Sequence, residues 1–124
     1  MRWTLVALAI AGCAPAADPT TLSPDSVSRE IAGRSTGPAQ ACVDTVPQQN
    51  VRALDSATLA YDQGPVLWVN RLTSACPGVR PGNITIVETR SGQFCRGDHV
   101  RGLDQGGNIP GPVCFLGDWT PYRS

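Results

Sequence analysis

Apolar and polar residues alternate in short runs along the second half of the chain. The alternation is clearest at residues 83–90, where Ile84, Ile86 and Glu88 would share one face of a strand and the residues between them the other. A period of two with many β-branched residues is typical of half-buried strands. On this pattern we expect strands at residues 50–54, 58–62, 66–72, 83–90, 94–103 and 113–121.

Turn-forming residues separate these runs. Asp55-Ser56, Gly64-Pro65 and Ser91-Gly92 fall between successive runs, and a longer loop holds Cys76-Pro77-Gly78. Residues 42–124 contain no sustained helical period, and Gly97 suggests a bulge within the fifth strand. We therefore predict an all-β domain: a small antiparallel meander of five or six strands, curled into a barrel or sandwich.

The first thirteen residues have the layout of an export signal. Arg2 supplies a positive charge, an apolar run follows, and Ile10-Ala11-Gly12 places small residues directly before Cys13. This pattern indicates a lipoprotein signal peptide at residues 1–12, with Cys13 as the acylated first mature residue. An ordinary secretory signal, cleaved near residues 14–17, is the alternative. Ala14 after the cysteine favours an outer-membrane anchor on the periplasmic side of the cell envelope.

Residues 13–41 are rich in Ala, Pro, Ser, Thr and Gly and poor in large apolar side chains. A segment of this composition buries too little surface to offset the entropy of ordering it. We expect a flexible linker between the lipid and the β domain at residues 42–124. Val27 and Ile31 are four apart and could form a helical turn or two, which Gly33 would end.

Cysteine spacing bears on both the compartment and the fold. Four cysteines remain after Cys13, an even number that favours two disulfides in an oxidising compartment. No Cys-x-x-Cys pair is present, which argues against a metal site. In an up-and-down meander, Cys42 and Cys95 fall at one end of the sheet and Cys76 and Cys114 at the other. Because a disulfide needs Cα atoms within about 7 Å, we predict the pairs Cys42–Cys95 and Cys76–Cys114.

The charged residues exclude some partners and some chemistry. Ten arginines balance ten acidic residues and there is no lysine, so no basic patch for nucleic acid is indicated. His99 is the single histidine and has no serine nucleophile near it in sequence. The aspartates lie mostly beside predicted turns, where they cap the backbone. We expect no catalytic residues, no cofactor and no metal.

Two functions remain open on these observations. The first is a non-catalytic binding or structural module at the membrane surface, with an envelope protein or a cell-wall component as partner. The second is a small periplasmic hydrolase using Asp and Arg side chains in a cleft. A pocket gathering Arg71, Arg96, Asp98 and His99 would favour the second, and an exposed flat or aromatic face would favour the first. The aromatic residues are expected mostly inside so small a core: Tyr61, Trp68, Phe94, Phe115, Trp119 and Tyr122.

The cysteine-centred motifs resemble a known bacterial family. They are Asn70-Arg71-Leu72 before Cys76-Pro77-Gly78, then Phe94-Cys95-Arg96-Gly97-Asp98, then Cys114-x-Leu116-Gly117. In this order, over about residues 42–122, they resemble the family catalogued as domain of unknown function 6491. The chain departs from that pattern at Ala75, where members often carry Arg, and at Phe115, where they often carry Gly. The resemblance implies a small four-cysteine envelope domain with no assigned activity.

Overall fold

The computed structural model describes residues 23–124 of the chain. One helix, α1 (Ser23–Ile31), precedes ten short strands. The strands are β1 (Ser35–Thr36), β2 (Cys42–Asp44), β3 (Arg52–Asp55), β4 (Thr58–Gln63), β5 (Val66–Arg71), β6 (Ile84–Glu88), β7 (Gln93–Cys95), β8 (His99–Leu103), β9 (Cys114–Phe115) and β10 (Trp119–Arg123). All the strand pairs are antiparallel, which confirms the predicted all-β class.

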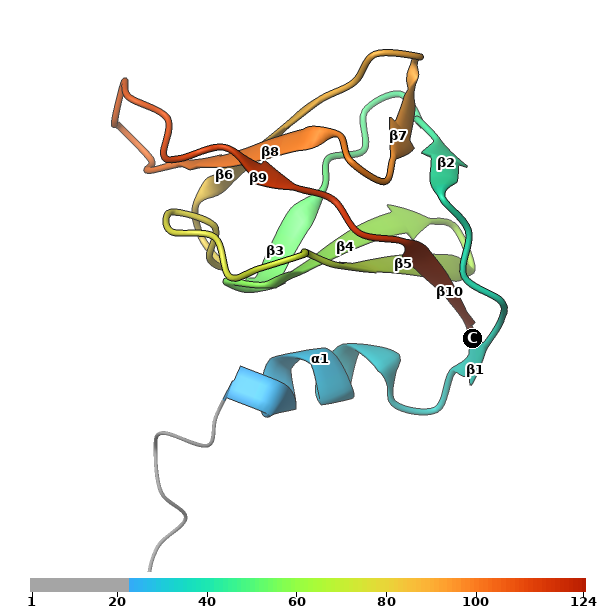
Figure 1. The fold of residues 1–124 in the computed structure, drawn as a ribbon. Helices are drawn as coiled ribbons and strands as arrows, with labels where there is room; N and C mark the ends of the chain where they lie inside the picture. Colours follow the sequence, from blue (N-terminus) through green and yellow to red (C-terminus); the bar gives the residue numbers. More distant parts are fainter. Residues whose placement is uncertain (1–22) are drawn as a thin grey trace, which may run out of the picture.

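The largest sheet has the strand order β1-β10-β5-β4-β3. Its β3-β4-β5 part is the expected meander, joined by short turns after Asp55 and Gln63. The neighbour of β5 on its other side is β10, with Trp119 opposite Asn70, and not the strand that follows β5 in sequence. The chain leaves this sheet because residues 72–83 form a long loop, which carries it to the other side of the core (Figure 1).

Two smaller sheets lie above the five-stranded sheet in Figure 1. They have the orders β6-β8-β9 and β2-β7. The single strand expected at residues 94–103 is divided between them as β7 and β8. The division occurs because Gly97 adopts a φ of 88° and the Asp98 carboxylate accepts the Cys95 N–H at 2.8 Å, which closes a turn.

The main core lies between the five-stranded sheet and the two smaller sheets. Its largest fully buried side chains include Trp119 and Tyr61, with Leu59, Val100 and Leu116 around them. The two polar aromatic groups are satisfied: Trp119 Nε1 donates to the Phe94 carbonyl at 2.9 Å, and the Tyr61 hydroxyl accepts the Val46 N–H at 2.6 Å. Of the six aromatic residues expected mostly inside, Tyr61 and Trp119 are fully buried and Phe115 is exposed. The other three are partly buried against the apolar clusters: Trp68, Phe94 and Tyr122.

Helix α1 corrects the expected linker. Residues 23–41 pack on the domain: Val27 is 6% exposed, Ile31 joins the same apolar cluster, and β1 pairs with β10. The cluster is completed by the face of the five-stranded sheet that points away from the main core, which offers Leu54 and Leu67. Two apolar residues one helical turn apart are enough to dock α1, because the sheet face beneath the helix is itself apolar. Cys13 lies outside the described residues.

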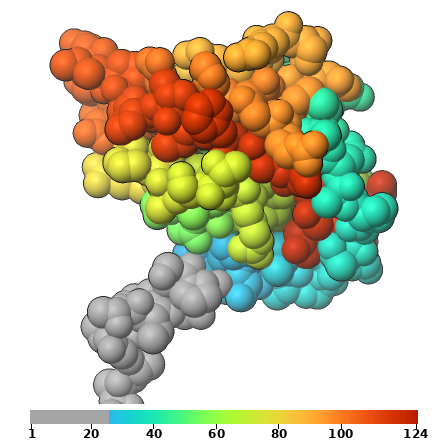
Figure 2. All heavy atoms as spheres, in the orientation of Figure 1, coloured from blue at the N-terminus to red at the C-terminus, as the bar shows by residue number. Residues whose placement is uncertain are grey.

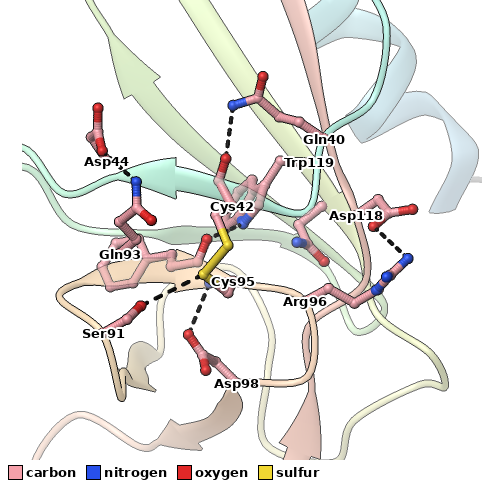
Figure 3. Close-up of a disulfide and its surroundings, with 12 residues drawn as sticks. Gln40, Cys42, Asp44, Ser91, Gln93, Cys95, Arg96, Asp98, Asp118 and Trp119 are labelled. Carbon is pink, nitrogen blue, oxygen red and sulfur yellow. Dashed lines mark hydrogen bonds and ion pairs between the residues drawn. A yellow bond between two sulfur atoms is a disulfide. The ribbon is translucent and has the colours of Figure 1, made fainter.

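Both predicted disulfides are present. Cys42–Cys95 joins β2 to β7 at directly opposite positions, with Cα atoms 4.0 Å apart (Figure 3). Cys76–Cys114 joins the loop after β5 to β9, with Cα atoms 6.0 Å apart. The first bridge fixes the N-terminal β2 to the small sheet, and the second fixes the long loop to the three-stranded sheet. The two disulfides thus anchor β2 and the long loop after β5, segments that have few strand pairings of their own.

Candidate functional site

The outward surface of the three-stranded sheet is the candidate site, and we call it the outer sheet face. Its members share one side of β6, β8 and β9 by strand alternation and by register. Val87, Val100 and Cys114 point to the opposite side, into the main core. The outer sheet face consists of Ile84, Ile86, Glu88, His99, Arg101, Leu103 and Phe115.

Apolar side chains are exposed on this face. Ile84 is 48% exposed and Phe115 is 45% exposed, at opposite corners of the sheet. The Phe115 ring meets the His99 ring edge to face, with centroids 5.3 Å apart. Ile109, at 86% exposure, lies outside the sheet in the loop beyond β8, which projects at one corner of Figure 2. Exposed apolar residues that share one face of a sheet are consistent with a binding surface.

Three charged or polar groups lie toward the Phe115 end of the face. Glu88 is opposite His99, and Arg101 lies two residues further along β8, opposite Ile86. The Glu88 carboxylate lies 3.8 Å from His99 Nδ1 and 4.0 Å from Arg101 Nε, within ion-pair distance of both but beyond hydrogen-bonding distance. Arg101 Nε is shielded from solvent and has no hydrogen-bond partner within residues 23–124. The Glu88 side chain is 54% exposed, so its oxygens are accessible to a further cation.

Strand β6 also leaves one backbone edge free. It is the end strand of its sheet, with β8 on one side only. Within the described part of the chain, no backbone hydrogen bond joins residues 84–88 to anything but β8. The outward N–H and C=O groups of this strand have no backbone partner within residues 23–124, and β3 lies close to β6.

The residues that would have formed a hydrolase pocket do not meet in a cleft. Asp98 is 7% exposed and is committed to the Cys95 N–H. Arg96 instead pairs with Asp118 at 3.1 Å (Figure 3). His99 faces Glu88 on the outer sheet face, and Arg71 ends β5 on the surface. Asp55 caps the turn after β3 by accepting the Ala57 N–H at 2.8 Å, as expected for a turn aspartate.

A cleft of about 370 Å³ lies elsewhere, between α1, β3 and Pro81. Arg52 crosses its wall and donates to both Glu30 oxygens, at 2.8 and 3.0 Å, and to Asp62 Oδ2 at 3.0 Å. The bonded Arg52 guanidinium holds the pKa of Glu30 below its usual range, and the two carboxylates raise that of Arg52. A carboxylate held in its charged form is a poor general acid, so this cluster is better suited to fixing α1.

Within residues 23–124, no three His, Cys, Asp or Glu side chains are grouped to hold a metal ion. Over the same residues, no helix is long and apolar enough to cross a membrane.

Comparisons with known proteins find no match for the chain. No protein-family model matches it. No curated protein is found to be similar. No solved structure matches its fold. The function must therefore be argued from the chain itself.

The sequence pointed to part of this face. Alternation placed Ile84, Ile86 and Glu88 together, which the structure confirms. It gave no sign that His99 and Phe115 lie beside them, because that depends on the register between three strands. Phe115 was expected in the core with Trp119. The two are four residues apart, a spacing that would place them on the same face of one continuous strand, but the chain bends between β9 and β10 and local alternation does not extend across the bend.

Proposed function

We propose that this protein is a lipid-anchored envelope protein whose β domain is a non-catalytic binding or structural module. The observation that carries the proposal is the outer sheet face, where Ile84 and Phe115 are 48% and 45% exposed. Large exposed apolar residues are costly on a small domain unless a partner covers them. The partner class is a protein or a cell-wall component of the envelope.

The location is proposed on separate grounds. The residues before Cys13 have the pattern of a lipoprotein signal, and two disulfides suit an oxidising space. We place the domain on the periplasmic side, with Ala14 favouring the outer membrane. The cysteine-centred motifs support membership of the family resembled, domain of unknown function 6491. A hydrolase remains the second candidate, and the cleft beside Arg52 is where its Asp and Arg side chains would have to act.

Site-specific photo-crosslinking tests the binding proposal. A photoreactive phenylalanine analogue at position 115 should form adducts in intact cells, because the side chain there is already aromatic and exposed. The same analogue at position 123, an exposed arginine on β10, serves as the control. The serine variants Ile84→Ser and Ile86→Ser should reduce the adducts at position 115. Equal crosslinking from positions 115 and 123 would contradict a dedicated binding face.

A further inference from the structure

Helix α1 is attached to the five-stranded sheet by side chains from one face of a short helix. Val27 and Ile31 pack in the apolar cluster with the sheet, and the Glu30 carboxylate pairs with Arg52 at 2.8 Å. The helix has nine residues, and helices shorter than about 12–15 residues are marginal in water even with good helix formers. We therefore expect α1 to be helical only while it is docked on the sheet.

The contact between α1 and the sheet is incompletely packed. The cleft of about 370 Å³ is lined by Ser26 from the helix and by Ala53 and Leu54 from β3. Protein interiors hold few voids larger than a water molecule, so a cleft of this size interrupts the contact. Because fewer atoms meet across it, weaker dispersion attraction holds α1 than holds a strand in the main core.

Neither disulfide fixes α1 to the domain. The bridges close the loops 42–95 and 76–114, and α1 ends at Ile31, ahead of both. The helix can therefore leave the sheet with both bonds intact. The described members of the main core all come from residues 43–119, on the other face of the sheet, so undocking leaves that core closed.

The chain between α1 and β1 has the features of a hinge. Beyond it, β1 pairs with β10, and the Gly37 N–H donates to the Pro121 carbonyl at 2.9 Å. Gly33 adopts a φ of 72°, a backbone conformation that costs glycine little. Rotation about residues 32–34 would therefore move α1 while β1 stays in the sheet.

We propose that α1 undocks from the five-stranded sheet as a unit while the rest of the domain stays folded, and that undocking lengthens the tether to the membrane. The docked form is the major one, and the undocked form is a minor population in exchange with it. Release of residues 23–34 adds up to about 40 Å of extended chain between Cys13 and β1. The longer tether rests on the proposed lipidation of Cys13, whereas undocking itself does not.

Native-state hydrogen exchange of the purified full chain in increasing urea tests the undocking. Amides of residues 27–31 should exchange at least about tenfold faster than those of β4 and β5. Their rate should depend little on urea, because undocking exposes little surface, whereas exchange in β4 and β5 should depend on it steeply. Equal rates with the same urea dependence would show that α1 unfolds only with the whole domain and would overturn the inference.

Variants of the docking contacts should change this exchange. Val27→Ser should speed exchange at residues 27–31 about tenfold, because a buried apolar side chain is lost. Glu30→Gln, a milder change, should speed it about two- to fivefold at pH 7. The control is Ile109→Ser, which truncates an isoleucine that is 86% exposed and should change the rate less than twofold. Equal effects of Val27→Ser and Ile109→Ser would overturn the inference.

Energy transfer in vesicles tests the longer tether. The membrane-extracted protein carries a donor dye on a non-natural residue at position 90, an exposed site before β7, and the vesicles carry an acceptor dye on their headgroups. The vesicles contain phosphatidylethanolamine and phosphatidylglycerol. The double variant Val27→Ser with Glu30→Gln should lower the energy transfer relative to Ile109→Ser, because more molecules have the longer tether.

The two measurements separate the parts of the inference. Faster exchange at residues 27–31 with unchanged energy transfer would support undocking and overturn the longer tether. If the extracted protein does not stay on the vesicles, the longer tether is overturned together with the proposed lipidation of Cys13, and the exchange result stands by itself.

Discussion

Asn70 and Gly117 exchange two hydrogen bonds inside the protein. Asn70 Nδ2 donates to the Gly117 carbonyl and the Gly117 N–H donates to Asn70 Oδ1, both at 2.8 Å. Asn70 is fully buried on β5, and this pair satisfies the backbone of the bend between β9 and β10. The amide side chain thus acts as a substitute for a neighbouring strand where the backbone turns away.

Replacing Asn70 should lower the free energy of unfolding by more than an average surface substitution does. In Asn70→Ala, a buried N–H and a buried carbonyl lose their partners, so we expect a loss of about 2–4 kcal/mol in the free energy of unfolding. Urea unfolding measures it. Asn108→Ala, in the exposed loop beyond β8, is the matched control and should change stability by less than about 0.5 kcal/mol. Equal effects from the two variants would contradict a structural role for the pair.

Gly102 on β8 is expected to tolerate no side chain. A Cβ atom there would collide with the Gly78 backbone carbonyl and lie 2.6 Å from the Val79 nitrogen. Because backbone and not a flexible side chain is in the way, Gly102→Ala should lower stability by about 3 kcal/mol or more, or prevent folding. Gly107→Ala, where a Cβ atom would lie 3.3 Å from the Asp104 backbone carbonyl oxygen, should fold. Thermal unfolding of the two variants gives the comparison.

The two disulfides should differ in their access to reductant. Cys76 is fully buried and Cys114 is 7% exposed, whereas Cys42 and Cys95 are both partly exposed. Under native conditions, dithiothreitol should therefore reduce Cys42–Cys95 first. Differential alkylation and mass spectrometry would follow each pair. Simultaneous loss of both would mean that reduction proceeds through global unfolding.

Each bridge should also contribute substantially to stability. They close loops of 53 and 38 residues, and the chain-entropy estimate gives about 4 kcal/mol for each. The paired variants Cys42→Ser with Cys95→Ser, and Cys76→Ser with Cys114→Ser, test this by urea unfolding. A domain of this size has little stability to spare, so we expect at least one of the two to be largely unfolded at 37 °C.

Glu30 links the docking of α1 to pH. Its pKa in the folded protein is lowered from 4.5, chiefly by its hydrogen bond from Arg52. A lowered pKa means that the charged form stabilises the fold above the pKa of the unfolded chain, and that this stability is lost as pH falls through the folded pKa. Glu30→Gln should cost up to about 1 kcal/mol at pH 7 and close to nothing at pH 2–3.

The control for this pH effect is Glu88→Gln. Glu88 has only long ion pairs, 3.8 Å to His99 Nδ1 and 4.0 Å to Arg101 Nε, and its side chain is 54% exposed, so the variant should change the free energy of unfolding by less than about 0.5 kcal/mol at both pH values. Urea unfolding at pH 7 and pH 3 would measure the four differences. A loss in Glu30→Gln that is the same at both pH values would show that packing of the side chain, and not its charge, holds α1.

Lipidation is expected on Cys13. Mass spectrometry of the membrane-extracted protein should find an acylated N-terminal cysteine peptide, and Cys13→Ala should release the protein into the soluble fraction. A soluble native protein that begins after Cys13 would contradict the proposed anchor.

The sequence predicted what depends on neighbouring residues. The alternation in β5 and β6, the turns and the all-β class are all confirmed. The cysteine pairing is also confirmed, although the chain does not follow the single meander used to derive it. The pairing survives because β2 with β7, and the loop after β5 with β9, still come together in the observed topology.

What the sequence did not predict depends on distant contacts. Helix α1 carries only Val27 and Ile31 as apolar anchors, too little for a stable helix by itself. Its stability comes from the sheet face beneath it and from Arg52. The position of β10 beside β5 and the exposure of Phe115 likewise depend on long-range pairing. The break at Gly97 had a local signal, which was interpreted as a bulge and is a full turn.

The docking of α1 limits how far the domain can stand from its membrane. A linker from Cys13 to Cys42 could have extended about 100 Å, whereas the ten residues from Cys13 to Ser23 reach at most about 35 Å. With Cys13 lipidated as proposed, this short tether would keep the β domain close to the membrane surface. Because α1 and the outer sheet face lie on opposite layers of the molecule, a tether before α1 would attach on the side away from the outer sheet face and leave that face directed away from the membrane (Figure 1).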